Sequence, residues 1–198
     1  MEAEDFAYGY ENQNQRRHKR LVVAQPFSSI NVTTIMQQAG LRRQTFYDYY
    51  RDKYDVLGDI YSSEVAAAAH YCGHYQYWPQ TVESIVAYFG TNRAFYQRVI
   101  QIDEQNAPEM VIQAHLRQMV ADIFKTMGEA EQVLIDTSYC KFLKDLLGAA
   151  LLSGIKEWLL ADHPVSVKQE TDYLQAYFQD GMNGFLLRAR KINTREIG

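Results

Sequence analysis

Apolar residues recur along most of this chain at the spacings of three and four positions that mark one face of an α-helix. No segment alternates apolar and polar residues with the period of two that is typical of a half-buried β-strand. The pattern therefore predicts an all-α fold. The predicted helices cover approximately residues 32–39, 42–50, 53–72, 81–90, 93–102, 109–127, 131–161 and 167–189.

Residues that favour helix ends frame the first part of this pattern. Asn31 is suited to the N-cap of helix 32–39, and Gly40 is suited to its C-terminal end. A second short helix, Arg42–Tyr50, follows the turn, and Asp52 is suited to cap the helix after it. A capped helix, a tight turn and a second helix predict a helix-turn-helix unit, in which the second helix enters the major groove of DNA.

Positive charge is concentrated in the same part of the chain. Between Gln15 and Lys53, eight Lys or Arg residues stand against two Asp residues, a local net charge of +6, whereas the whole chain has a net charge of −4. A basic segment on an acidic chain is typical of a protein that contacts a polyanion with one end. Such a run can also be a solvated face, but its coincidence with the helix-turn-helix pattern favours double-stranded DNA as the partner.

Side chains at the start of the second short helix are suited to base edges. Arginine can form two hydrogen bonds with guanine, and glutamine can do the same with adenine. We therefore expect base contacts from Arg42, Arg43, Gln44 and Thr45. Hydroxyl and ammonium groups nearby are suited to DNA phosphates. The expected phosphate contacts are Thr33, Thr34, Tyr47, Tyr49 and Lys53. Phe46 and Tyr50 are expected to face inward and hold the short helix in place.

This region resembles the DNA-binding signature of the TetR family of bacterial transcription regulators. The resemblance is carried by INVTTIMQQAGLRRQTFYDYYRDKYDVL, with its capped helix, its AG turn and its TFYDYY helix. The segments RRQTFYDYY, NRAFYQRVIQID and GIKEWLLADHPVS resemble one branch of that family, the regulators similar to DhaS, the activator of a dihydroxyacetone kinase operon. The resemblance implies a three-helix DNA-binding domain at residues 1–56. It also implies a helical domain at residues 57–198 that dimerises and senses a signal.

The first helix departs from the family pattern. The segment ENQNQRRHKRLVVAQPF offers the core little besides Leu21, Val22 and Phe27, and Pro26 ends it. This thin core face predicts a small DNA-binding domain of modest stability.

The predicted helices 131–161 and 167–189 carry apolar residues over more than one stripe. Two apolar faces need two partners, so a four-helix bundle formed by two chains is our interpretation, although burial of both helices within one monomer also fits. Small residues that allow close approach are Gly148, Gly154, Gly181 and Gly184. A two-fold homodimer predicts a roughly palindromic operator.

The signal sensed by the C-terminal domain is left open by the sequence. His70, Cys72 and His74 lie close enough along the chain to bind a metal such as zinc, but Gly73 favours the end of the helix between them. The aromatic residues of the domain suit a pocket for a small-molecule effector, although at helical spacing they also suit plain core. These residues are Tyr77, Trp78, Tyr88, Phe89, Phe95, Tyr96, Phe124, Tyr139, Phe142 and Trp158. The resemblance admits a third source, a co-regulator protein that carries the signal.

Other function classes have less support. The chain lacks a Gly-rich phosphate loop, a G-x-S-x-G elbow and an H-E-x-x-H pair, so we expect neither an enzyme nor a bound cofactor. A protein-interaction module without DNA binding is the stronger rival, because aromatic-rich faces suit it. The acidic opening MEAEDFAYGY does not resemble a signal peptide, and the longest near-apolar run, LLGAALLSGI, is too short to span a bilayer. These features predict a cytoplasmic protein without membrane contact.

Overall fold

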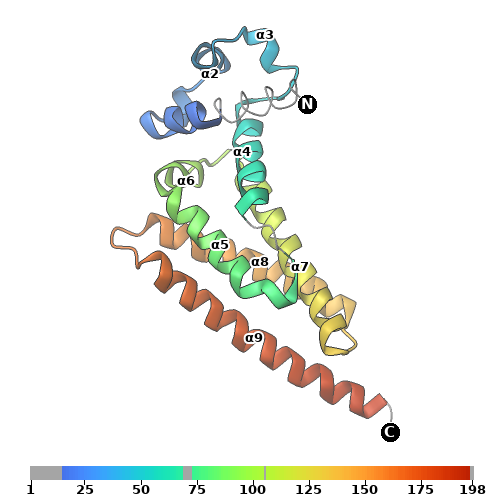
Figure 1. The fold of residues 1–198 in the computed structure, drawn as a ribbon. Coiled ribbons are helices and arrows are strands. Elements are labelled where there is room, and N and C mark those ends of the chain that lie inside the picture. The colour runs from blue at the N-terminus through green and yellow to red at the C-terminus, as the bar shows by residue number, and fades with distance from the viewer. Residues whose placement is uncertain (1–14, 69–72, 105, 197–198) are drawn as a thin grey trace. The chain divides into compact units, whose positions relative to one another are not determined.

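A computed structural model describes residues 15–68, 73–104 and 106–196, and the regular elements of this part of the chain are all helices (Figure 1). The prediction of an all-α fold is confirmed. Residues 15–24 are helical and are called the first helix below. The elements that follow are η1 (Phe27–Ser29), α2 (Val32–Ala39), α3 (Arg43–Phe46), α4 (Lys53–Ala68), η2 (Tyr75–Tyr77), α5 (Trp78–Thr91), α6 (Arg93–Val99), α7 (Glu109–Glu131), α8 (Thr137–Leu160) and α9 (Val167–Glu196).

The chain divides into two compact units. The N-terminal unit contains the described residues up to Glu64 together with Asn92–Val111, and the C-terminal unit contains Val65–Thr91 and the described residues from Ile112 onward. The sequence predicted one boundary, after residue 56. The chain crosses between the two units more than once, first after Glu64 and again after Thr91 and Val111. Helix α6 and the segment after it return to the unit that holds the helix-turn-helix.

The caps that the sequence predicted for α2 and α4 are confirmed, whereas α3 ends at Phe46 and is shorter than the predicted helix 42–50, because residues 47–49 form turns. The Asn31 side-chain oxygen accepts a hydrogen bond from the backbone N–H of Thr34 at 2.9 Å. Gly40 ends α2 with a φ of 72°, a left-handed conformation that glycine adopts without steric cost. An Asp52 carboxylate oxygen accepts from the backbone N–H groups of Tyr54 at 2.8 Å and Asp55 at 3.1 Å, which satisfies the start of α4.

Among the described residues, the core of the N-terminal unit is apolar with two polar exceptions. The first helix buries Leu21 and Val22 as expected, and it also buries Gln15 and His18. The other buried side chains include Phe27, Ile30, Met36, Phe46, Val56, Leu57 and Ile60. The thin face predicted for the first helix is therefore completed by an amide and an imidazole rather than by further apolar residues.

The long helix predicted at 131–161 starts later than expected. Gln132 has a φ of 53°, and α8 begins only at Thr137. Asp136 caps it, because its carboxylate accepts from the backbone N–H groups of Ser138 at 2.8 Å and Tyr139 at 3.2 Å. The predicted start at residue 131 is wrong. The apolar residues Leu134 and Ile135 keep the helical spacing in the sequence, although they lie in the non-helical segment that ends at the N-cap Asp136.

The C-terminal unit is a layered helical body in which α9 lies along α5 (Figure 1). The rings of Trp78 and Phe178 lie 6.5 Å apart between their centroids, and the Gln175 side-chain amide donates to the carbonyl of Pro79 at 2.8 Å. The indole of Trp158 donates to the carbonyl of Val165 at 3.0 Å and so fixes the connection between α8 and α9. Within the described ranges, no helix combines the length and the hydropathy that crossing a bilayer requires.

Candidate nucleic-acid interface

The short helix α3 is held in place by aromatic residues. The Phe46 side chain is buried, and its ring centroid lies 5.4 Å from those of both Tyr47 and Tyr50. The Tyr50 hydroxyl donates to the Asp59 carboxylate of α4 at 2.8 Å. These contacts compensate for the weak intrinsic stability of a four-residue helix, and the inward orientation predicted for Phe46 and Tyr50 is confirmed.

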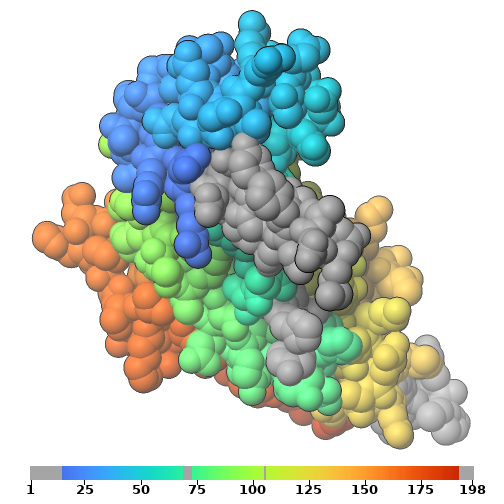
Figure 2. All heavy atoms as spheres, turned by 45° about the horizontal axis from the view of Figure 1, so that its top comes forward, coloured from blue at the N-terminus to red at the C-terminus, as the bar shows by residue number. Residues whose placement is uncertain are grey.

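The four side chains expected to contact bases lie at the start of α3. Arg42, Arg43 and Gln44 are exposed, and Thr45 is half-buried. The Arg43 guanidinium donates to the hydroxyl of Tyr47 at 3.1 Å and lies 5.7 Å from the centroid of its ring. This contact orients the arginine before any partner arrives. The atoms of α2 and α3, light blue in Figure 2, lie open at the surface of this unit.

The residues expected to contact phosphate differ in how accessible they are. Thr33 is exposed, and the Thr34 hydroxyl donates to the side-chain oxygen of Asn31 at 3.1 Å. The exposed fraction is 47% for Tyr47 and 78% for Tyr49, so both phenol rings are open to a partner on this surface. Base and phosphate roles for all of these residues stay predictions.

Lys53 has a structural role that sequence reasoning missed. Its ammonium group donates to the carbonyl of Phe27 at 2.8 Å and to that of Ile30 at 3.0 Å. It also lies 4.5 Å from the ring centroid of Phe27 and 5.4 Å from that of Tyr54. Lys53 therefore joins η1 to the start of α4, and two of its three N–H donors are engaged. Its carbonyl partners lie 26 and 23 residues earlier in the chain, so no short stretch of sequence shows this role.

Carboxylates near α3 and the start of α4 form hydrogen bonds with neighbouring groups. Arg51 donates to Asp55 through its Nε and Nη2 atoms at 2.8 and 2.7 Å, and these hydrogen bonds lower the pKa of the Asp55 carboxyl. Asn106 donates to Asp52 at 2.8 Å. A hydrogen bond to the Glu104 carboxylate raises the pKa of the Tyr54 hydroxyl to about 12. The segment after α6 is thereby tied to the start of α4 within the N-terminal unit.

Basic residues of the first helix also have partners within this unit. The Lys19 ammonium lies 2.7 Å from the Glu64 carboxylate and 2.6 Å from the side-chain oxygen of Asn92. Arg17 donates to the carbonyl of Gln38 at 3.1 Å and so links the first helix to α2. The basic segment thus stabilises the fold at Arg17 and Lys19, while Arg42 and Arg43 stay exposed at α3.

The candidate metal ligands are only partly within the described chain. His70 and Cys72 lie outside the described residues, and His74 is exposed just before η2. Gly73 has a φ of 91°, in agreement with the predicted helix end. Among the residues that the structure describes, no three His, Cys, Asp or Glu side chains are grouped so as to hold a metal ion.

The aromatic residues considered for an effector pocket do not surround one space. Phe95 and Tyr96 are buried in the N-terminal unit, where Tyr96 packs against Tyr61 with 6.4 Å between ring centroids. Most of the others are core of the C-terminal unit, and Phe142 is exposed.

One concave surface of the C-terminal unit lies between α8 and α9. Tyr139 stacks on Phe185 with 6.0 Å between ring centroids, and the Arg188 guanidinium lies 4.0 Å from the Tyr139 ring. The groove beside this cluster has a volume of about 420 Å³. Its walls include the exposed side chains of Leu146 and Tyr177. Exposed apolar side chains that gather beside a groove are typical of an interface between proteins.

Comparison with known proteins gives consistent results. The TetR-type family model described as "Transcriptional regulator C-terminal region" matches residues 76–180. The HTH-type dhaKLM operon transcriptional activator DhaS of Lactococcus lactis is 31% identical over 86 residues, which are 43% of this chain and 46% of that protein. The match therefore spans just under half the length of this curated relative. A solved structure, the dihydroxyacetone kinase operon activator DhaS, has a TM-score of 0.64 at 20% identity and covers 86% of this chain and 96% of its own. That likeness shows the same fold.

Proposed function

Because the chain belongs to the TetR family of transcription regulators and is of the DhaS type, we propose that it binds a double-stranded DNA operator as a homodimer. The observation that carries this proposal is the group of exposed side chains at the start of α3, on a helix that Phe46 and Tyr50 hold in place. Arginine and glutamine side chains at the N-terminal end of a recognition helix reach base edges in the major groove.

The roles proposed for the interface divide into two groups. Arg42, Arg43, Gln44 and Thr45 contact base edges and select the sequence. Thr33, Thr34, Tyr47, Tyr49 and Lys53 contact phosphates and position α3 on the duplex. Only contacts of the first group distinguish one DNA sequence from another, so the two groups are separable by experiment.

Replacement of Arg43 by Ala is expected to weaken operator binding by about 1–3 kcal/mol and to relax sequence preference, because a bidentate contact to one base is lost. Fluorescence anisotropy with the operator and with a scrambled duplex measures both effects at one fixed salt concentration. Lys125→Ala is the matched control, since it removes one positive charge from an exposed position on α7 of the C-terminal unit. An equal loss of affinity for both duplexes in Arg43→Ala would contradict the base-contact role.

The proposed dimer uses the exposed surface of α8 and α9. Phe142 and Leu146 on α8 and Tyr177 on α9 are each more than half exposed, at 56%, 51% and 54%. Gly181 and Gly184 on α9 have open space where a side chain would begin, because no other atom lies within 4 Å of a Cβ built on either residue. Apolar side chains beside small residues favour close packing of a second helix pair. Two-fold pairing of this surface would present two copies of α3, with half-sites about 34 Å apart or slightly more.

Replacement of Gly184 by Arg is expected to raise the dimer dissociation constant by about tenfold or more, because two-fold symmetry places both arginines in one self-complementary patch. Gly184→Ala is the control: it is expected to keep the dimer and to stabilise α9 by up to about 1 kcal/mol through helix propensity. Sedimentation equilibrium measures the first effect and thermal unfolding the second. Unchanged dimerisation in Gly184→Arg would place the interface elsewhere.

The proposal includes a signal received by the C-terminal unit, from either a small-molecule effector or a co-regulator protein. Such a signal acts by shifting the population between dimers that fit the operator and dimers that do not. A signal that releases DNA without changing the separation of the two α3 helices would contradict this part of the proposal.

A further inference from the structure

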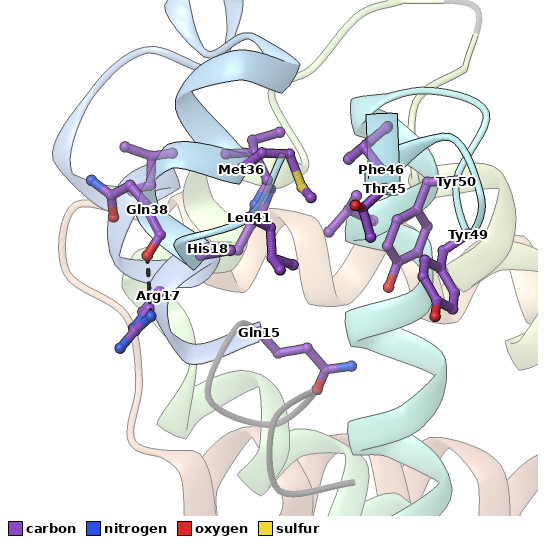
Figure 3. Close-up of a pocket in the computed structure, with 14 residues that line it drawn as sticks. Gln15, Arg17, His18, Met36, Gln38, Leu41, Thr45, Phe46, Tyr49 and Tyr50 are labelled. Carbon is purple, nitrogen blue, oxygen red and sulfur yellow. Dashed lines mark hydrogen bonds between the residues drawn. The ribbon is translucent and has the colours of Figure 1, made fainter. Parts of the chain in front are cut away.

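A pocket lies within the N-terminal unit, beneath the recognition helix. It is formed by side chains of the first helix, α2, α3 and the segment after α3, and its volume is about 270 Å³. Figure 3 shows the labelled side chains of these elements around it. A cavity of about 150 Å³ holds benzene, so this pocket has room for two fused rings. Most of its wall is apolar, with Leu21, Ile35, Met36, Leu41 and Phe46 among the lining residues.

The pocket contains an unsatisfied polar side chain. His18 is only 4% exposed, and within the part of the chain that the structure describes neither of its ring nitrogens has a hydrogen-bond partner. Burial lowers the pKa of His18 to about 4, so the ring is neutral near pH 7 and offers one N–H donor and one nitrogen acceptor. A buried polar group without a partner is unfavourable, which makes His18 a strong point of attachment for a ligand that supplies one.

The lining residues restrict the charge of such a ligand. Among the residues that the structure describes, no carboxylate lines the pocket, so none of them attracts a cation there. Among the described lining residues the one guanidinium is that of Arg17, whose charge is screened because the side chain is exposed to solvent, and it donates to the carbonyl of Gln38 at 3.1 Å. An apolar wall with one neutral imidazole suits an uncharged aromatic molecule that carries a hydroxyl group, because a hydroxyl both donates and accepts.

We propose that this pocket is a second, separate ligand site that binds a small uncharged aromatic alcohol through His18. Such a ligand contacts α2 through Ile35 and Met36 and α3 through Thr45 and Phe46 at the same time. Thr45 is also one of the residues proposed to contact bases. Occupancy of the pocket and the placement of α3 are therefore linked, and by reciprocity the ligand and DNA affect each other's affinity. The existence of the site does not rest on DNA binding.

The test uses two probes of the same size, 2-naphthol and 2-methylnaphthalene, with the full-length protein labelled with ¹⁵N. We expect saturable chemical-shift changes from 2-naphthol at the amides of α2 and α3, and about tenfold weaker binding of 2-methylnaphthalene, which lacks the hydroxyl. The probes are tested up to 1 mM, a concentration that detects about millimolar affinity. Each of three outcomes would overturn the proposal: no saturable change with 2-naphthol, equal affinity for both probes, or changes confined to α8 and α9.

Two substitutions identify the hydrogen-bonding group. His18→Phe keeps a ring of similar size but removes both nitrogens, so the preference for 2-naphthol should disappear while both probes still bind. His18→Gln retains a donor and an acceptor, so the preference should be kept. A preference that survives in His18→Phe would overturn the role of His18. Circular dichroism of each variant checks its fold, and the comparison of probes on the wild type decides the proposal if either variant unfolds.

A competing occupant is the start of this same chain. Gln15 lines the pocket, and residues 1–14 precede it in the sequence. If the full-length protein does not bind 2-naphthol but a variant without residues 2–13 does, the pocket is a docking site for the chain's own first residues, and the small-molecule proposal is wrong.

Discussion

Replacement of Lys53 by Met is expected to lower the free energy of unfolding of the N-terminal unit by about 2–3 kcal/mol. The substitution keeps most of the aliphatic stem but removes the ammonium group that donates to the carbonyls of Phe27 and Ile30. After the substitution the Phe27 carbonyl still accepts a hydrogen bond from the backbone N–H of Ile30 at 3.0 Å. Loss of the ammonium donor is therefore more costly at the Ile30 carbonyl. The cation–π contact with the Phe27 ring, at 4.5 Å, is lost as well.

Arg51→Met is the matched control for this prediction. Arg51 is a neighbouring cation whose side chain is 89% exposed, and its ion pair with Asp55 is screened by solvent. We therefore expect the control to unfold at nearly the same urea concentration as the wild type. If Lys53→Met behaves in the same way as the control, the bonds to η1 do not stabilise the unit. Salt titration of operator binding is a separate readout, because loss of a phosphate contact reduces the slope by about one.

The N-terminal unit is expected to lose about 3 kcal/mol of stability between pH 6.5 and pH 4, because His18 is buried in its neutral form. Its pKa is about 4 in the folded unit and 6.5 in the unfolded chain. Between these values the unfolded chain binds a proton that the folded unit does not. The contribution of neutral His18 to the free energy of unfolding is therefore complete above pH 6.5 and decreases as the pH is lowered. Below pH 4 protonation of His18 causes no further decrease.

His18→Leu is expected to remove this pH dependence, since leucine is apolar and does not titrate. His74→Leu is the control, because His74 is exposed. Urea unfolding of both variants and the wild type at pH 7, 6, 5 and 4 makes the comparison, with a fluorescent label on the first helix to report on this unit. A decline in His18→Leu as steep as that of the wild type would show that another group is responsible. Burial also lowers the pKa of His115 in the C-terminal unit, so a label specific to the N-terminal unit is essential.

The sequence was sufficient for the local features of the helix-turn-helix. Asn31, Gly40 and Asp52 act through the backbone atoms of their near neighbours, so their effects are visible in a short stretch of sequence. Phe46 and Tyr50 were assigned inward from local sequence as well, and although α3 ends at Phe46, the backbone N–H of Tyr50 still donates to the Phe46 carbonyl at 3.0 Å, which keeps both side chains on one face.

Features that depend on distant contacts could not be predicted in this way. His18 is polar, and only the packing of the first helix on α2 and α3 shows that it is buried. Lys53 was assigned to phosphate by its charge, because its carbonyl partners lie 23 and 26 residues earlier in the chain. The return of α6 to the N-terminal unit depends on long-range packing, such as that of Tyr96 on Tyr61. The break before α8 was missed because the apolar spacing continues across it through Leu134 and Ile135, and the cap at Asp136 was not considered.

Recognition of a DNA sequence by a dimer of this protein through α3 is the function that we propose. The most direct test is selection of bound duplexes from a random DNA pool by the purified protein, repeated with Arg43→Ala. We predict that the wild type enriches a palindrome with two half-sites and that the variant enriches a weaker or more degenerate sequence. Absence of enrichment at moderate salt, or the same palindrome recovered equally well by Arg43→Ala, would contradict the claim.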